Sequence, residues 1–148
     1  MIFAVTAVIA LAGVLLAVSL LPEEESRPVA WRDLSRGIGP LTIVLQERRL
    51  FRDQGQLDRY LARAGSRGRA PTINFSKRQL LLVSPGPRSS TGYAVEVLSV
   101  RERDGDITVR VRERSPGLGT HVEARVTHPY RLLSLPASQD VYVDWVGR

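Results

Sequence analysis

The side chains that most often perform chemistry are scarce in this chain of 148 residues, which has two histidines, His121 and His128, and no cysteine. If residues 121–126 form a strand, His121 and Glu123 lie on one face at positions i and i+2, as two ligands of one metal do. No third ligand follows at a matching spacing, so a metal site is not predicted. The lack of cysteine excludes a disulfide framework, a thiol nucleophile and a cysteine-acylated lipid anchor.

Other catalytic arrangements are missing as well. No serine stands in a Gly-x-Ser-x-Gly elbow, and the segment 86–92 has its glycines in the wrong order for a phosphate loop. The acidic pair Glu102 and Asp104 borders a predicted turn, where solvated surface is expected rather than acid–base catalysis. The sequence therefore predicts a non-enzyme that needs no cofactor. A hydrolase or metal-dependent enzyme built on His121, Glu123 and His128 is the alternative from another class.

The net charge of +6 makes nucleic acid a partner to consider. Five arginines share one face of two predicted strands: Arg101, Arg103, Arg110, Arg112 and Arg114. Acidic residues at positions 102, 104, 106 and 113 interrupt them, so no nucleic-acid binding is predicted. A basic face close to a membrane leaves a cell-envelope polymer or lipid headgroups as a further alternative.

The elements that must position any site are predicted from periodicity. The apolar run 41–45 predicts a first strand. Residues 54–64 predict an amphipathic helix that begins after the N-cap Asp53 and ends at Gly65. Its apolar positions, at offsets of three and four, are Leu57, Tyr60, Leu61 and Ala64.

From residue 73 onward the patterns are typical of strands. The continuous apolar run 80–84 predicts a strand buried on both faces, and the alternating residues 122–126 predict another. Residues 130–135 and 141–146 complete the set. The expected fold class is α+β, with one amphipathic helix and a mainly antiparallel β-sheet that forms a small sandwich or barrel.

The dipeptide Asp104-Gly105 predicts a two-residue hairpin turn between residues 93–103 and 106–114. Such a turn pairs Val100 with Val109. The same register sets Glu96 opposite Glu113, which places like charges face to face. We therefore expect a bulge or a register slip near Glu96.

The first 22 residues carry no charge, and 18 of them are apolar. A helix of this length spans about 30 Å, the thickness of a bilayer core. The segment predicts a membrane anchor or a signal peptide cleaved near 17–19, and either places the following domain outside the cytoplasm. The expected organisation is a signal peptide or membrane anchor at 1–22, a linker at 23–40 and one domain at 41–146.

Four motifs in the expected domain resemble the C-terminal domain of the PrcB family, which comprises exported accessory proteins of bacterial protease complexes. The motifs are Asn74-Phe75-Ser76-Lys77, Ser89-Ser90-Thr91-Gly92-Tyr93, Ser115-Pro116-Gly117-Leu118-Gly119 and Thr127-His128-Pro129-Tyr130. The first corresponds to the family's Asp-Phe-Ser-Lys motif and the second to its Pro-Thr-Gly-Gly-Tyr motif, each with substitutions.

The resemblance implies a non-catalytic module that binds a secreted or surface protease and stabilises or regulates it. A looser likeness to chagasin-like protease inhibitors, in the loops at 91–93, 117–119 and 128–130, implies direct inhibition instead. Both resemblances imply that the protein-binding residues lie in these loops. They are Ser90, Thr91, Gly92, Tyr93, Gly117, Gly119, His128, Pro129 and Tyr130.

Overall fold

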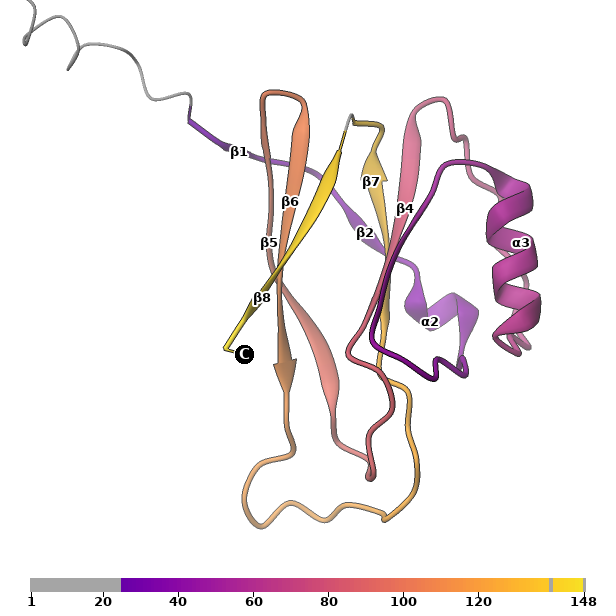
Figure 1. Cartoon of the computed structure of the whole chain (residues 1–148), viewed down its shortest axis with the longest axis vertical. Coiled ribbons are helices and arrows are strands. Elements are labelled where there is room, and N and C mark those ends of the chain that lie inside the picture. Colours follow the sequence, from indigo (N-terminus) through magenta and orange to yellow (C-terminus); the bar gives the residue numbers. More distant parts are fainter. Residues whose placement is uncertain (1–24, 139, 148) are drawn as a thin grey trace, which may run out of the picture.

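The computed structural model describes residues 25–138 and 140–147 as two four-stranded sheets with helices on one side (Figure 1). The first sheet has the strand order β1-β5-β6-β8 and the second has the order β2-β7-β4-β3. The elements are β1 Arg27–Pro28, β2 Arg32–Asp33, α2 Ser35–Ile38, β3 Glu47–Phe51, α3 Gln54–Arg63, β4 Arg78–Ser84, β5 Ala94–Arg103, β6 Asp106–Arg114, β7 Arg131–Pro136 and β8 Val141–Val146. The mainly β, α+β class is confirmed, and the two sheets do not close into a barrel.

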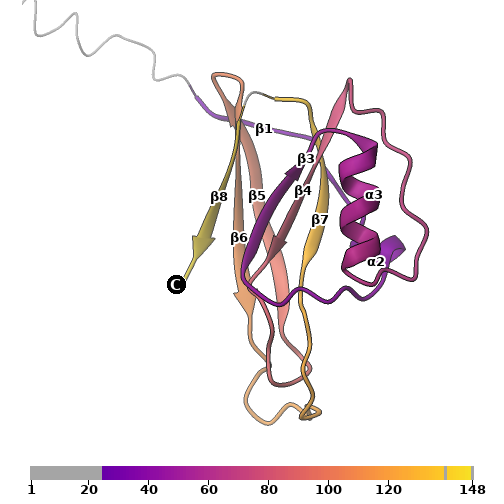
Figure 2. The same ribbon diagram turned by 45° about the vertical axis from the view of Figure 1, so that its right-hand side comes forward.

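The second sheet is the central layer, because its middle strands are buried on both faces (Figure 2). Leu80 and Leu82 of β4 pack into a core shared with α3, together with Leu132 of β7. Leu81 and Val83 point the other way, into a core shared with the first sheet. This double burial explains why β4 reads as an unbroken apolar run, and it confirms the expectation for residues 80–84.

Helix α3 has the predicted start and end. Asp53 has extended backbone dihedrals, and its Oδ1 accepts a hydrogen bond of 2.8 Å from Gln56 N. Gly65 follows the helix with a φ of 75°, a left-handed conformation that favours glycine and stops helical propagation. The apolar stripe of α3 is buried against the second sheet through Leu57, Tyr60 and Leu61.

The hairpin β5–β6 confirms both the turn and the bulge. Asp104 and Gly105 have φ values of 55° and 87°, as a type I′ turn requires, and Val100 pairs with Val109. The register shifts between Val97 and Ser99, which moves Glu96 opposite Arg112. The extra residue also keeps Val95 and Val97 in the core between the sheets. Without it, alternation would turn both valines toward solvent.

Residues 25–40, which the sequence predicts as a linker, contribute strands to both sheets. β1 pairs antiparallel with β5, and β2 pairs antiparallel with β7, so the chain passes from one sheet to the other. The side chain of Ser35 is buried, and its Oγ accepts a hydrogen bond of 2.8 Å from Leu132 N. The predicted leader at 1–22 lies outside the described residues. Within the described part of the chain, no helix is long and apolar enough to cross a membrane.

Two predicted strands are wrong. Residues 41–45 form no strand, because Thr42 N donates to Ala64 O at 2.8 Å and Ile43 O accepts from the ring of His128 at 2.9 Å. With these groups bonded to a helix end and a loop, pairing begins only at β3. Residues 122–126 are also irregular. The backbone of Glu123 bonds to Thr91 instead of to a neighbouring strand.

We predict that deletion of Leu98 is tolerated. Leu98 is 44% exposed and occupies the bulge, so its removal restores regular alternation and leaves every other pair in register. The free energy of unfolding in urea should change by less than about 1 kcal/mol.

Deletion of Arg110, an exposed residue in the unbulged strand β6, is the matched control. That deletion turns either Val109 or Val111 out of the core and should prevent folding. Equal destabilisation by both deletions would show that the bulge does not set the register.

Candidate functional site

The two long loops 85–93 and 115–130 meet at one end of the sandwich and are called the loop cluster here (Figure 1). Their backbones are joined by a bridge in which Arg88 and Thr127 exchange two N–H···O bonds of 2.8 Å. Thr91 N donates to Glu123 O at 3.0 Å, and Thr91 Oγ1 accepts from Glu123 N at 2.9 Å. Thr127 Oγ1 donates to Ser90 O at 2.8 Å. The loops therefore hold each other in place without a regular ladder.

Arg88 holds the base of the loop cluster and was missed by the motif analysis. Its Nε and Nη2 donate to the two carboxylate oxygens of Glu113 at 3.0 and 2.5 Å, a bidentate pair. Its guanidinium carbon also lies 5.9 Å from the centre of the Tyr93 ring. Because Glu113 is opposite the buried Val95, its carboxylate faces inward and needs a cation. The alternation of Val109, Val111 and Glu113 was the signal that could have found this pair.

Gly92 is required by the packing of the two loops. Its φ is 93°, and a Cβ at this position would lie 2.9 Å from Cβ of Pro116. Any larger residue would push the two loops apart, so the Thr-Gly-Tyr and Ser-Pro-Gly motifs meet at this contact. Gly119, with a φ of 77°, ends a turn in which Thr120 N donates to Gly117 O at 3.1 Å.

His128, Pro129 and Tyr130 connect the loop cluster to the helical side of the domain. His128 Nδ1 donates to Ile43 O at 2.9 Å, so this nitrogen carries the ring proton in that bond. Pro129 O accepts from Ser84 Oγ at 2.8 Å. The Tyr130 hydroxyl donates to Gly39 O at 2.6 Å and lies 3.2 Å from Ser35 O. Burial, together with the nearby Asp33, raises the pKa of Tyr130 to about 12.

A cavity of about 280 Å³ brings the predicted aromatic and histidine residues together. Tyr93, His128, Pro129 and Tyr130 line it, along with Arg36 and Arg131. Of the residues predicted for protein binding, these four therefore share one concave surface. Ser90 and Thr91 instead form hydrogen bonds within the cluster, and Gly117 and Gly119 lie in the loop 115–130, away from this cavity.

The loop cluster exposes apolar side chains that the packing does not use. Leu118 is fully exposed between Gly117 and Gly119, and Val126 is 66% exposed. Leu45 is 73% exposed next to the cluster, where its carbonyl carbon would lie 3.1 Å from a Cβ on Gly86. Apolar groups exposed on loops that are already held by internal bonds are available to a binding partner at low entropic cost.

The side chains considered for metal binding or catalysis are not brought together. His121 and Glu123 are exposed in the irregular segment, and Glu123 pairs with Arg125 at 3.0 Å. Among residues 25–138 and 140–147, no group of three or more histidine and acidic side chains lies close enough to hold a metal.

The arginines on the outer face of the first sheet are neutralised by neighbouring acids. Arg110 pairs with Asp144 at 2.9 Å, and Arg112 pairs with Glu96 at 2.7 Å. The hydrogen bond from Arg112 lowers the pKa of Glu96. Arg103 and Arg114 also lie within 3.5 Å of a carboxylate. This pairing removes most of the positive charge that a nucleic-acid phosphate backbone would contact.

Comparison with known proteins finds one family. The PrcB C-terminal family matches residues 80–136, which is less than half of the chain and extends from β4 through both loops to the end of β7. This match confirms the resemblance noted from the motifs, three of which lie inside the matched segment. The search found no match among curated proteins or solved structures.

We predict a loss of stability above pH 10 that depends on Tyr130. Its pKa is raised from 10 to about 12 in the folded protein. The neutral hydroxyl therefore stabilises the fold fully below pH 10, and this stabilisation is lost as the pH rises from 10 to 12. The substitution Tyr130→Phe should cost about 1 kcal/mol at pH 7 and reduce the alkaline loss, as measured by urea unfolding between pH 7 and 12.

Tyr142→Phe is the control, because Tyr142 is 53% exposed on β8. It should leave the stability profile unchanged. An alkaline loss of the same size in the Tyr130→Phe variant and the unmodified chain would contradict the assignment.

Proposed function

From the match of residues 80–136 to the PrcB C-terminal family, we propose that this protein is a non-catalytic module that binds a secreted or surface protease through the loop cluster. The observation that carries the proposal is the loop cluster itself. Its two loops are fixed by mutual hydrogen bonds and by the Arg88–Glu113 pair, yet Leu118 and Val126 at its surface remain exposed. Loops already ordered in the free protein lose little conformational entropy on binding.

The position of the loop cluster supports contact with a large partner. Residue 25, where the described chain begins, lies beside the Asp104-Gly105 turn, and the loop cluster is at the opposite end of the sheets (Figure 1). We propose that residues 1–22 anchor the protein or direct its export, and that the domain works outside the cytoplasm. A domain held at residue 25 presents its loop cluster away from the point of attachment.

Stabilisation of the protease and direct inhibition of it remain the two modes of action within this proposal. The fully exposed Leu118 favours a contact that inserts one apolar side chain into a partner's pocket. A stabiliser binds away from the catalytic cleft, whereas an inhibitor occupies the cleft. The protease's turnover number with and without this protein distinguishes the two modes.

We predict that Leu118→Asp and Val126→Asp each reduce recovery of the protease at least about ten-fold when the tagged full chain is purified from its source cells. Both side chains are exposed, so neither substitution should change the unfolding midpoint. Recovered proteases are identified by mass spectrometry, and their turnover is then measured with purified full chain.

Leu98→Asp provides the matched control, since Leu98 is an exposed leucine in the β5 bulge, outside the loop cluster. It should recover the protease as the unmodified chain does. Recovery of no protease by the unmodified chain would contradict the proposed function, and equal losses in all three variants would contradict the loop cluster as the binding surface.

A further inference from the structure

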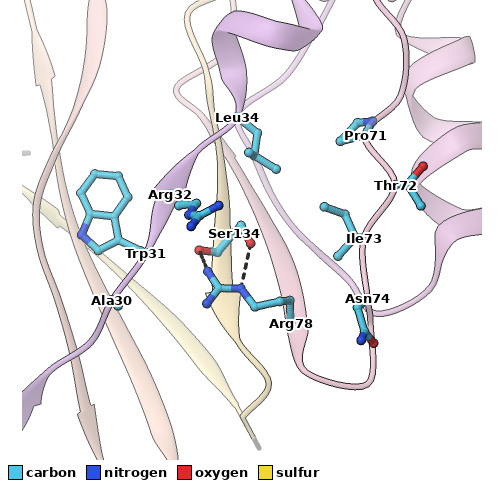
Figure 3. A pocket seen from close by; sticks show the side chains of 10 residues that line it. All are labelled: Ala30, Trp31, Arg32, Leu34, Pro71, Thr72, Ile73, Asn74, Arg78 and Ser134. Atoms are coloured by element: carbon cyan, nitrogen blue, oxygen red, sulfur yellow. Dashed lines mark hydrogen bonds between the residues drawn. The ribbon is translucent and has the colours of Figure 1, made fainter.

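A second cavity, of about 580 Å³, lies on the helical face of the second sheet (Figure 3). It is bordered by residues 30–32 and Leu34 on one side and by the segment 71–74 on the other, with Arg78 and Ser134 between them. Its volume falls within the range of about 300–1,000 Å³ that is typical of ligand sites. Arg78 stands at the start of β4, whereas the loop cluster follows the other end of that strand. The cavity is therefore separate from the proposed protease contact.

Arg78 is partly buried in this cavity and is held by neutral groups. Its Nε donates to Ser134 Oγ at 3.0 Å, and its Nη2 donates to Ser134 O at 2.6 Å (Figure 3). These two bonds fix the plane of the guanidinium and leave its remaining N–H groups for another acceptor. Within residues 25–138 and 140–147, no carboxylate pairs with Arg78, although partly buried charges usually have a counterion.

Arg32 adds a second positive charge on the same face. Ser134 on β7 is the register partner of Arg32. The side chains of Arg32 and Ser134 therefore project from the same face of the second sheet as Arg78. Arg32 is also without a carboxylate partner in the described part of the chain, and no acidic residue lines the cavity. The only acidic neighbour in β2, Asp33, instead pairs with Arg131 at 3.4 Å.

Apolar side chains complete the walls of the cavity. Leu34 and Ile73 pack against the helical core, and the indole of Trp31 is 37% exposed at the rim. β2 is the outermost strand of its sheet, so an extended chain can lie along this edge. Two cations beside apolar walls suit a carboxylate next to an aliphatic side chain.

We propose that this cavity binds an acidic peptide segment, with glutamate or aspartate carboxylates on Arg78 and Arg32 and an aliphatic side chain against Leu34 and Ile73. The bidentate geometry available to a fixed guanidinium favours a carboxylate over a neutral amide. The site does not depend on the loop cluster, so it can be tested apart from the proposed function.

The test uses the full chain, labelled with 15N-tryptophan and held in lipid nanodiscs. The probe is the peptide acetyl-Leu-Glu-Leu-Glu-amide, and its glutamine counterpart is the comparison. We expect the indole signal of Trp31 to shift saturably with the glutamate peptide, while the signal of Trp145 on β8 does not move. The glutamine peptide should bind at least about ten-fold more weakly.

Arg78→Gln and Arg32→Gln should each weaken binding of the glutamate peptide about ten-fold. Arg48→Gln, an exposed arginine on β3 outside the cavity, changes the net charge equally and should have no effect. If Arg78→Gln lowers the unfolding midpoint, the exposed Arg32 still provides the test.

Three outcomes would overturn the proposal: no shift of Trp31, equal weakening by Arg48→Gln, or the same saturable shift with sodium acetate at equal carboxylate concentration. The last would show a simple anion site with no preference for a peptide. None of these outcomes affects recovery of the protease through Leu118 and Val126, so the two proposals fail separately.

Discussion

The fold depends on the burial of β4 and β7 on both faces. Leu80, Leu82 and Leu132 close the core under the helices, while Leu81, Val83 and Leu133 close the core between the sheets. Complete burial of one such side chain contributes about 1.5–3 kcal/mol, and both cores draw on the same two strands. Neither the helices nor the first sheet has an apolar partner without this layer. Both loops of the cluster also join it, one directly after β4 and the other directly before β7.

The loop cluster is ordered largely by specific hydrogen bonds and by one ion pair. Its backbone groups bond to Thr91, Thr127 and the Arg88 main chain, and the inward-facing Glu113, near the end of the adjoining strand β6, is neutralised by the Arg88 side chain. Because polar groups are satisfied inside the cluster, its apolar residues are not needed for folding and can remain at the surface. Leu118 and Val126 are exposed for this reason. A surface of this kind is fixed before binding, as the proposed contact with a folded protein requires.

Short-range signals in the sequence correctly predicted the features whose structure depends on residues near one another in the chain or across one hairpin. The N-cap at Asp53, the Asp104-Gly105 turn and the bulge required by Glu96 and Glu113 follow from short-range rules, and all are confirmed. The strands expected at 41–45 and 122–126 failed because their backbone bonds go to distant partners, Ala64 and Thr91 among them. The contribution of residues 27–33 to both sheets was not predictable from their polar, proline-containing pattern. For the site, the motifs identified both loops but missed Arg88, because the alternation of Val109, Val111 and Glu113 indicates an inward-facing acid without identifying its cation, which lies 25 residues away in the sequence.

The arginines show why composition alone did not identify the binding surfaces. On the outer face of the first sheet, Arg110 and Arg112 alternate with inward valines and meet acids on the neighbouring strands, so they stabilise the sheet modestly and carry little free charge. Arg88 is shielded and holds the loop cluster together. Arg78 is also shielded, yet it bonds only to the hydroxyl and carbonyl of Ser134. The net charge of +6 does not distinguish among these arginines. An arginine that is paired with a carboxylate has a structural role, whereas one without such a partner can bind a ligand. This difference in placement favours the cavity beside β2 as a binding site.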